Sequence, residues 1–261
     1  MLANITPVLL TFNEAENIER ALSRLGWAKD IVIVDSGSTD ETLAIASKFP
    51  QVRIFHRAFD THANQWRFAV ETTAIQTTWI LRLDADYELS TELISEMEQL
   101  REEAPVNGYR ISFDYAIYSR KLKSSLYPPN TVLLRVGQFS VTDNGHTEKW
   151  LVDGPIENLR GRITHDDRKA LSVWFAAQQR YASLEAEHLL GADPAALSRS
   201  GRLRRMAWPA PMLVFFYVLL FKGCLLDGWA GWFYALQRLA AETMIALELI
   251  DRRLRDMQKK R

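Results

Sequence analysis

The chain has 261 residues, of which 48% are hydrophobic and 11% aromatic, enough apolar material for one sizeable core and part of another. Its 32 Lys and Arg residues balance its 32 Asp and Glu residues, so no net positive field attracts nucleic acid and we expect no such partner. The single cysteine, Cys224, excludes an intramolecular disulfide and is typical of a reducing compartment. The N-terminal residues lack a basic stretch followed by an apolar one, and we expect no cleaved signal peptide.

Short apolar runs alternate with amphipathic helical patterns through residues 5–100. The runs predict strands at 5–11, 31–34, 52–55 and 78–84. Helices are expected after Asn13, from Ser38, over 66–73 and from Ser90; Ser38 and Glu41 have the spacing of a capping box. This alternation predicts an α/β fold with a mostly parallel, Rossmann-like sheet flanked by helices.

The pattern changes after Pro105. Further strands are expected at 108–113, 131–135 and 156–163, followed by a helix over 171–188. We therefore expect a sheet domain over residues 1–195 and a C-terminal helical segment over residues 196–261.

The fourth apolar run ends on two carboxylates, Asp84 and Asp86, which leave the same face of a strand because side chains alternate with period two. Paired carboxylates repel unless a cation lies between them, and Mg2+ or Mn2+ prefers such oxygen ligands. Polar loops at 11–13, 35–40 and 84–86 each follow a strand, so they are expected to share one edge of the sheet. This convergence favours a metal–diphosphate site over the alternative of an ordinary surface turn.

Three motifs in this order resemble the family 2 glycosyltransferases of GT-A fold. They are residues 7–14 (PVLLTFNE), 31–40 (IVIVDSGSTD) and 83–86 (LDAD). Residues 26–28 (GWA), 152–155 (VDGP) and 225–229 (LLDGW) are further similar to the lipopolysaccharide-core glucosyltransferase subfamily. The resemblance implies inverting transfer of a sugar from a nucleotide-diphosphate sugar, with a UDP-sugar expected, to a lipid-linked or cell-surface glycan.

The resemblance also implies roles for individual residues. The residues implied beside the donor nucleotide are Pro7, Thr11, Asn13, Glu14, Asp35, Ser36, Arg67, Asp84 and Ala85. The implied metal ligands, for Mg2+ or Mn2+, are Asp84, Asp86 and the late histidine His165. Simpler roles stay open for some of these residues: Thr11 and Asn13 as helix caps, Asp35 as the holder of a Gly-Ser turn, and Arg67 as a solvated side chain beside the unusual Trp66.

Inverting transfer needs a base that takes the proton of the acceptor hydroxyl. The subfamily commonly has His followed directly by Glu, whereas this chain has His146-Thr147-Glu148. Counting back from Asp153 places Glu148 at the family's carboxylate position, with Asp143 and His146 as the alternatives.

The uncharged run from Met206 to Phe221 has 16 residues, and a membrane-spanning helix needs about 20. Tryptophans such as Trp208 and Trp229 are typical of a membrane–water interface, and Arg204, Arg205 and Lys222 suit anionic headgroups. We expect interfacial or re-entrant helices, with the protein cytoplasmic and peripheral to the cytoplasmic face of the inner or plasma membrane. A buried hairpin, an oligomer formed through these helices, and a true span are the alternatives.

Two other functions fit parts of the pattern. A sugar nucleotidyltransferase also uses such a sheet and paired metal carboxylates, although residues 11–14 lack the Gly-rich basic loop usual in that class. A catalytically silent, membrane-bound scaffold of the same fold is the second alternative. The altered order around Glu148 favours it, and the intact Asp84 and Asp86 oppose it.

Overall fold

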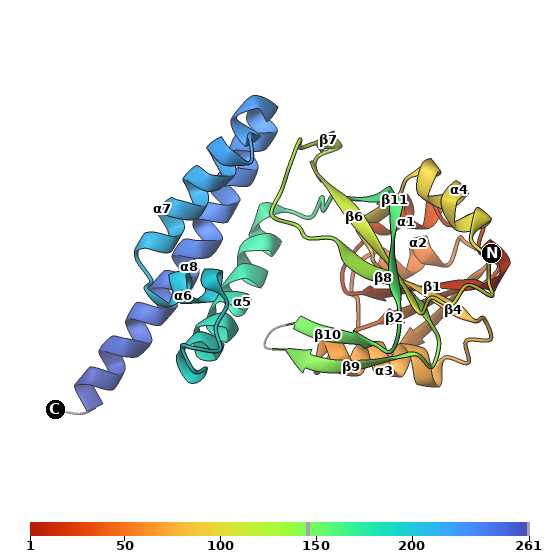
Figure 1. Cartoon of the computed structure of the whole chain (residues 1–261), viewed down its shortest axis with the longest axis horizontal. Helices are drawn as coiled ribbons and strands as arrows, with labels where there is room; N and C mark the ends of the chain where they lie inside the picture. The colour runs from red at the N-terminus through yellow and green to blue at the C-terminus, as the bar shows by residue number, and fades with distance from the viewer. Residues whose placement is uncertain (145–146, 260–261) are drawn as a thin grey trace. The chain divides into compact units, whose positions relative to one another are not determined.

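The computed structural model describes residues 1–144 and 147–259, which form a mixed α/β structure (Figure 1). The strands are β1 (Ile5–Thr11), β2 (Ile31–Asp35), β3 (Val52–His56), β4 (Trp79–Asp84), β5 (Tyr87–Leu89), β6 (Gly108–Ile117), β7 (Arg120–Lys121), β8 (Asn130–Arg135), β9 (Phe139–Asn144), β10 (Thr147–Val152) and β11 (Ile156–His165). The α-helices are α1 (Ile18–Ser23), α2 (Thr42–Ala46), α3 (His62–Thr72), α4 (Thr91–Gln99), α5 (Leu171–Gly191), α6 (Arg199–Arg205), α7 (Pro209–Phe216) and α8 (Trp229–Lys259). Short helical turns are η1 (Leu2–Asn4), η2 (Tyr217–Phe221) and η3 (Cys224–Asp227).

The main sheet has the strand order β3-β2-β1-β4-β8-β6-β11-β5, and β7 pairs with β6 at its end. Strands β3, β2, β1 and β4 are parallel to one another, as are β6 and β11, whereas β8 and β5 run antiparallel to their neighbours. Strands β9 and β10 form a separate antiparallel pair. The predicted α/β class with a mostly parallel sheet and flanking helices is confirmed.

The central strands are buried on both faces, because successive residues enter different hydrophobic clusters. Leu9 and Ile33 pack in the cluster that contains residues of α1 and α4, whereas Val8 and Val32 pack in the cluster that contains Trp66 of α3. Side chains on a strand alternate between faces, so a strand covered by helices on both sides needs an unbroken apolar run. This is why residues 7–10 and 31–34 are apolar without interruption.

The predicted strands and most of the predicted helices of residues 5–100 are confirmed, but the predicted start of α2 is wrong. Ser90 caps α4 as expected, since its Oγ accepts from the N–H of Leu93 at 3.1 Å. The helix expected from Ser38 begins instead at Thr42. Ser38 uses its hydroxyl across the loop, donating to Asp35 and accepting from the N–H of Asn13. A partner brought close by the tertiary fold therefore outweighs the local capping pattern.

Four strands were not predicted: β5, β7, β9 and β10. Strands β5 and β7 are short, and β5 is held by pairing with β11. In the β9–β10 pair, Val141 is buried, and Phe139, Trp150 and Val152 pack against the α3-side cluster. The period-two spacing of these apolar residues is the signal that could have predicted β9 and β10.

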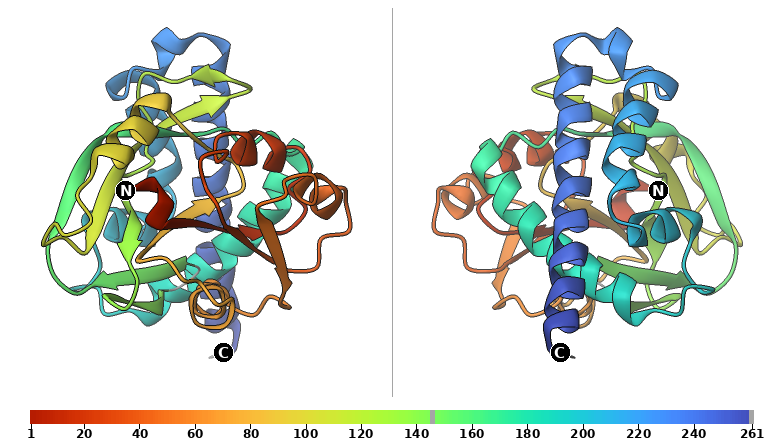
Figure 2. Two further views of the ribbon diagram at one scale, coloured as in Figure 1. Left: turned by 90° about the vertical axis from the view of Figure 1, so that its right-hand side faces the viewer. Right: turned by 90° about the vertical axis from the view of Figure 1, so that its left-hand side faces the viewer.

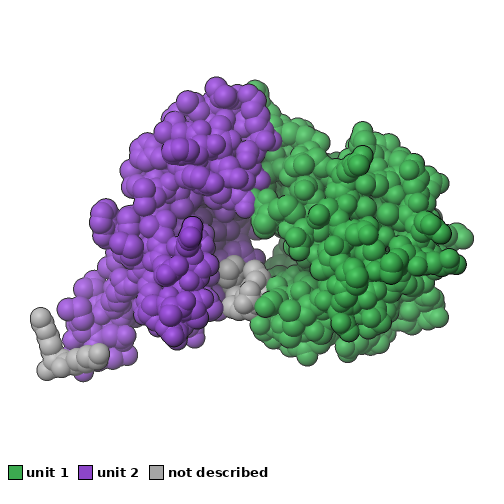
Figure 3. Space-filling model, viewed as in Figure 1, with its two compact units in different colours: residues 1–121, 127–169 green, residues 122–126, 170–261 purple. Residues whose placement is uncertain are grey.

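The chain divides into two compact units (Figure 3). Unit 1 contains residues 1–121 and 127–169, and unit 2 contains residues 122–126 and 170–261. The sequence placed residues 170–195 with the sheet, whereas the structure groups them with the C-terminal helices. The physical reason is that Ala186 and Leu189 of α5 are buried in a cluster with Leu249 of α8.

In unit 2, α5 and α7 pack against the long helix α8 (Figure 2). Arg204 of α6 makes a two-pronged ion pair with Glu242 of α8, with Nη2 to Oε1 at 2.6 Å and Nε to Oε2 at 2.9 Å. Gly231 lies against η3, where a β-carbon would stand 1.8 Å from the carbonyl oxygen of Cys224, so a side chain there has no room. Across residues 1–144 and 147–259, no helix combines the length and the apolar character needed to cross a membrane.

Candidate active site

The polar loops that the sequence assigned to one edge of the sheet do meet there. Thr11 pairs with Asp35 between β1 and β2, and Leu10 pairs with Asp84 between β1 and β4. Because these strands are parallel, the loops that follow them share the carboxyl edge, where ligands bind in open α/β sheets. Pro7, in contrast, lies buried inside β1 opposite Leu81, so the structure does not bring this predicted donor residue to the edge.

The buried carboxylate of Asp35 is saturated by hydrogen bonds from its own chain. Oδ1 accepts from Thr11 Oγ1 at 2.8 Å and from Ser38 Oγ at 2.5 Å. Oδ2 accepts from the N–H groups of Gly37 and Ser38 at 2.9 and 2.8 Å. Burial alone would raise the pKa of Asp35, but these bonds outweigh it and lower that pKa. The geometry thus shows Asp35 holding the Gly-Ser turn, and its donor contact stays a prediction.

Asn13 joins two of the loops. It adopts a left-handed backbone with φ of 53°, donates its N–H to Ser38 Oγ at 2.8 Å, and accepts from the N–H of Thr39 at 2.8 Å. It is therefore not a helix cap. Ser36 accepts a hydrogen bond from Gln65 of α3 at 2.7 Å, which ties the second loop to the helix beneath it.

Glu14 is held in an internal ion pair. Lys169 Nζ donates to Glu14 Oε1 at 2.5 Å, and Asn17 Nδ2 donates to Oε2 at 2.9 Å. Burial raises the pKa of Glu14 to about 7, although the charge of Lys169 opposes this shift. The charge of Asp86 raises the same pKa further, so Glu14 and Asp86 lie close enough to interact. This arrangement links the loop after β1 to the segment after β11.

Asp84 and Asp86 have different surroundings. Asp84 is exposed, whereas Asp86 is buried and its Oδ2 lies 3.0 Å from Nε2 of His165. Burial opposes charge on both members of that pair, yet their ion pair lowers the pKa of Asp86 and raises the pKa of His165. Protein atoms crowd the Asp84 carboxylate even though solvent reaches it. This desolvation, followed by the charge of Asp86, raises the pKa of Asp84.

An aromatic cage surrounds His165. Its ring centroid lies 5.4 Å from that of Tyr87, and 4.8 Å from those of both Tyr115 and Tyr127. The hydroxyl groups of Tyr87 and Tyr127 contact each other. Rings packed on several sides leave His165 little rotational freedom, so the cage keeps Nε2 directed at Asp86.

The donor atoms at this edge fit a hard divalent cation that shares its ligands with a diphosphate. Within the described part of the chain, the buried atoms Asp86 Oδ1 and His165 Nδ1 have no hydrogen-bond partner. Buried polar atoms are usually paired, so an unpaired one indicates a missing partner such as a water or an ion. No three His, Cys, Asp or Glu side chains of residues 1–144 and 147–259 gather closely enough to hold an ion alone. Mg2+, however, is usually held by one or two carboxylates plus substrate phosphates, and Asp84 and Asp86 match that pattern. His165 faces Asp86 as an ion pair, and its role as a metal ligand stays a prediction.

Of the two candidate bases that the structure describes, Asp143 and Glu148, the second has its carboxylate held within the fold. Its side chain is 16% exposed, and Oε1 accepts from Arg82 Nη1 at 3.1 Å. Asp143 is 51% exposed and lies 4.0 Å from Arg67, itself 46% exposed, so that pair is a loose surface contact. His146 lies outside the described residues. The charge of Glu148 raises the pKa of Asp84, which places these two carboxylates in one electrostatic environment.

Four residues at or beside this edge were not among the sequence candidates: Gln65, Arg82, Tyr127 and Lys169. The sequence could have indicated Arg82, since a charged residue inside an apolar strand needs a partner. It could not have indicated Lys169, because its partner Glu14 is remote in sequence.

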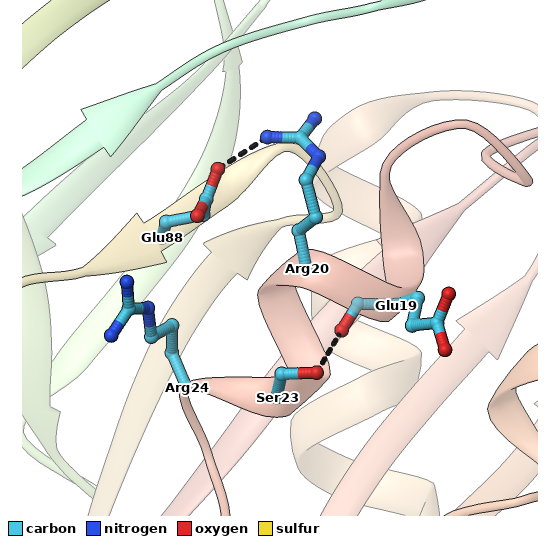
Figure 4. Close-up of a pocket in the computed structure, with 5 residues that line it drawn as sticks. All are labelled: Glu19, Arg20, Ser23, Arg24 and Glu88. Carbon is cyan, nitrogen blue, oxygen red and sulfur yellow. Dashed lines mark hydrogen bonds and ion pairs between the residues drawn. The ribbon is translucent and has the colours of Figure 1, made fainter. Parts of the chain in front are cut away.

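A surface pocket of unit 1 lies elsewhere, beside α1 and β5 (Figure 4). It is lined by Glu19, Arg20, Ser23, Arg24 and Glu88. Arg20 pairs with Glu88, and the Ser23 hydroxyl donates to the backbone oxygen of Glu19, whereas the buried Nε of Arg20 has no partner among the described residues. We assign the candidate site to the strand ends because two carboxylates, Asp84 and Asp86, lie there, and the buried Oδ1 of Asp86 has no hydrogen-bond partner in the described part of the chain.

Comparison with known proteins gives the family. The model of the family described as "Glycosyl transferase family 2" matches residues 7–159. An uncharacterized glycosyltransferase of Rickettsia bellii is 37% identical over 97 residues, which are 37% of this chain and 32% of that protein. The match thus spans about a third of the length of that relative. The lipopolysaccharide core biosynthesis glycosyltransferase LpsC of Rhizobium meliloti is 25% identical over 195 residues, covering 70% of each chain.

Solved structures with the same fold have low sequence identity. The mannosyltransferase PcManGT from Pyrobaculum calidifontis, in complex with GDP-Man and Mn2+, has a TM-score of 0.54 at 13% identity, over 96% of this chain and 88% of that one. TarS 1–349 of S. aureus, in complex with UDP-GlcNAc, has a TM-score of 0.50 at 13% identity, over 96% and 91% of the two chains. At this identity the likeness shows the fold alone, and it confirms the expected GT-A type.

Proposed function

The chain belongs to glycosyl transferase family 2, and from that premise we propose that it moves a sugar from a nucleoside-diphosphate sugar to a hydroxyl group of a glycan. The observation that carries the proposal is the position of Asp84 and Asp86 at and just after the end of β4, which pairs with β1, itself the neighbour of β2. Two carboxylates at a carboxyl edge suit a cation shared with a diphosphate. The family match over residues 7–159 contains both carboxylates and Glu148.

The proposed reaction is an inverting displacement. The acceptor oxygen forms a bond to the anomeric carbon, and the bond from that carbon to the diphosphate oxygen breaks, with its electron pair leaving on the diphosphate. Glu148 takes the proton of the acceptor hydroxyl as this happens. Asp84 and Asp86 are the residues that would hold a divalent cation, which neutralises charge on the leaving group when bound. Glu14, Lys169 and His165 hold the surrounding loops and Asp86 in place.

We propose a UDP-sugar as donor and a lipid-linked glycan as acceptor. The relative LpsC is named as a glycosyltransferase of lipopolysaccharide core biosynthesis, which supports an acceptor of this kind. The solved neighbours hold GDP-Man and UDP-GlcNAc, so nucleoside-diphosphate sugars of both types suit the fold.

The acceptor proposal extends to the membrane surface. Segment 206–229 of unit 2 exposes large apolar side chains: Trp208 is 77%, Phe221 81% and Leu226 71% exposed. The half-buried Lys222 lies within this segment and the exposed Arg202 shortly before it in the sequence. Exposed apolar side chains together with basic residues suit anionic lipid. Arg204, expected at the headgroups, is instead engaged by Glu242. We propose that this segment lies on the cytoplasmic face of the inner or plasma membrane.

A donor screen tests the proposed function. The full chain is mixed with UDP-, GDP- and dTDP-sugars, with and without Mn2+, and thermal unfolding and donor hydrolysis are measured. We expect one donor class to raise the unfolding midpoint, since a ligand that binds only the folded state stabilises it, and Mn2+ to increase the effect. If no sugar nucleotide is hydrolysed, and a nucleoside triphosphate and a sugar 1-phosphate are instead converted to a sugar nucleotide and pyrophosphate, the protein is a nucleotidyltransferase.

A further inference from the structure

Arg82 is a buried arginine inside an otherwise apolar strand. Strand β4 reads WILRLD, and Arg82 is 7% exposed. A guanidinium removed from water is costly unless its donors find partners. Arg82 also points to the same face of β4 as Asp84, because the two residues are two positions apart.

The partners of Arg82 converge on Glu148. Its Nε donates to the backbone oxygen of Thr131 at 3.0 Å, and its Nη1 donates to Glu148 Oε1 at 3.1 Å. Its Cζ lies 4.8 Å from the ring centre of Trp150, a cation–π distance. Trp150 Nε1 in turn donates to the same Oε1 of Glu148 at 3.3 Å.

These contacts give the two oxygens of Glu148 different roles. Oε1 receives both of the hydrogen bonds described above, so rotation of the carboxylate would break an ion pair and an indole bond together. Trp150 is itself fixed, with its ring centroid 5.4 Å from that of Trp66 in α3. Glu148 is therefore fixed by Arg82 of β4 and by Trp150 of β10, which in turn packs on Trp66 of α3.

We propose that Arg82 is a positioning residue for the transfer reaction. It anchors Oε1 of Glu148 and thereby presents Oε2 to the acceptor hydroxyl as the proton-accepting atom. This inference rests on the proposed function, because it takes Glu148 as the base. It predicts an effect on turnover beyond any effect on folding, since misplacing a reacting group by about 1 Å can cost roughly a hundredfold in rate.

Arg135 of β8 is a matched control. Its Cζ lies 4.6 Å from the ring centre of Trp79, and its Nε and Nη2 donate to the backbone oxygens of Val106 at 3.2 Å and Ala104 at 3.0 Å. Like Arg82 it covers a tryptophan and bonds backbone carbonyls, but those contacts include no carboxylate of the site. Replacing Arg135 therefore measures the structural cost alone.

The experiment compares Arg82→Met and Arg82→Lys with Arg135→Met and Arg135→Lys in the full chain. Donor KM, kcat and the unfolding midpoint are measured with the donor found in the screen. Arg82→Met should lower kcat roughly a hundredfold with little change in donor KM, and Arg82→Lys should recover part of the loss. The Arg135 variants should lower the unfolding midpoint and leave kcat near that of the unsubstituted chain.

The same Arg82 substitutions in a Glu148→Gln background separate positioning from structure. If Arg82 acts through Glu148, Arg82→Met adds almost nothing to the loss caused by Glu148→Gln, because residues that act as a unit are not additive. An equal fold-loss in both backgrounds, or equal effects of the Arg82 and Arg135 variants, overturns the proposal. If Arg82→Met fails to fold, the two lysine variants decide by the same comparison. An unsubstituted chain that transfers no sugar refutes the proposed function itself. Normal transfer in Glu148→Gln refutes the base assignment and this inference together.

Discussion

Nε2 of His165 lies 3.0 Å from Oδ2 of Asp86, which joins the end of β11 to the turn after β4. The N–H of Asp166 also donates to the backbone oxygen of Asp86 at 3.2 Å. Asp86 is thus held by both its side chain and its backbone, while the neighbouring Asp84 stays open to solvent. One carboxylate is fixed and the other is accessible, an arrangement that suits a cation arriving with a diphosphate.

Asp86→Asn removes one charge from the proposed cation site and keeps the shape of the side chain. Because the Lewis-acid role of a metal is worth several kcal/mol, we expect transfer to slow by about a hundredfold or more. The stabilisation of the donor complex by Mn2+ should weaken as well, as measured by thermal unfolding. Asp114→Asn is the control, since Asp114 pairs with Lys121 and Arg162 instead. Full activity in Asp86→Asn would show that Asp86 is not a ligand of a metal needed for transfer.

Glu148→Gln should keep donor binding and slow transfer by roughly 10²–10⁴-fold, the usual contribution of general base catalysis. Gln keeps an oxygen that accepts from Arg82, so the fold should be little affected. Donor affinity by titration and kcat by product formation are the two measurements. The exposed Asp143 serves as comparison. A large loss in Asp143→Asn together with normal transfer in Glu148→Gln would identify Asp143 of β9 as the base instead.

Asp35 should contribute to stability in a pH-dependent way. Its pKa in the folded chain is lowered below the ordinary value of 3.8, so its contribution is complete above that pH and is lost as the pH falls through the folded value. Asp35→Asn should therefore cost about 1–3 kcal/mol at pH 7, the usual cost of leaving a buried group unsatisfied. The difference from the unsubstituted chain should shrink below pH 3.8. Urea unfolding at several pH values tests this, and a gap that widens in acid contradicts it.

The exposed apolar side chains of unit 2 should control attachment to lipid. Replacing Trp208, Phe221 and Leu226 by Ser should abolish flotation with anionic vesicles, because interfacial binding scales with buried apolar area. Leu254 and Met257 are also exposed, at 54% and 58%, but lie in the last turns of α8, and their Ser variants are the control. Flotation that persists in the triple variant, or a full chain that ignores the vesicles and forms dimers, would instead make this face a contact between copies.

Cys224 should be unreactive in the folded protein. The residue is buried, and burial raises the pKa of its thiol to about 11, so little thiolate is present near neutral pH. A thiol reagent should label it only after unit 2 opens, and because the chain has one cysteine the signal reports that event alone. Labelling in the folded chain as fast as in urea would show that unit 2 is open.

The sequence alone determined the strand ends of unit 1. An unbroken apolar run followed by two carboxylates at period two is a local pattern, and parallel strands bring the loops after 11, 35 and 84 to one edge. The two-sided burial of β1 and β2 could likewise be read from their composition, because helix-covered strands need apolar residues on both faces.

Tertiary structure decided how the polar groups pair. Ser38 has a local capping pattern, yet it bonds Asp35 and Asn13, since those groups lie closer once the loops meet. The pairs Glu14–Lys169 and Arg82–Glu148 join residues remote in sequence, and no local spacing predicts them. A buried charge needs an opposite charge at contact distance, and that distance exists only after β10 and the segment that follows β11 are in place.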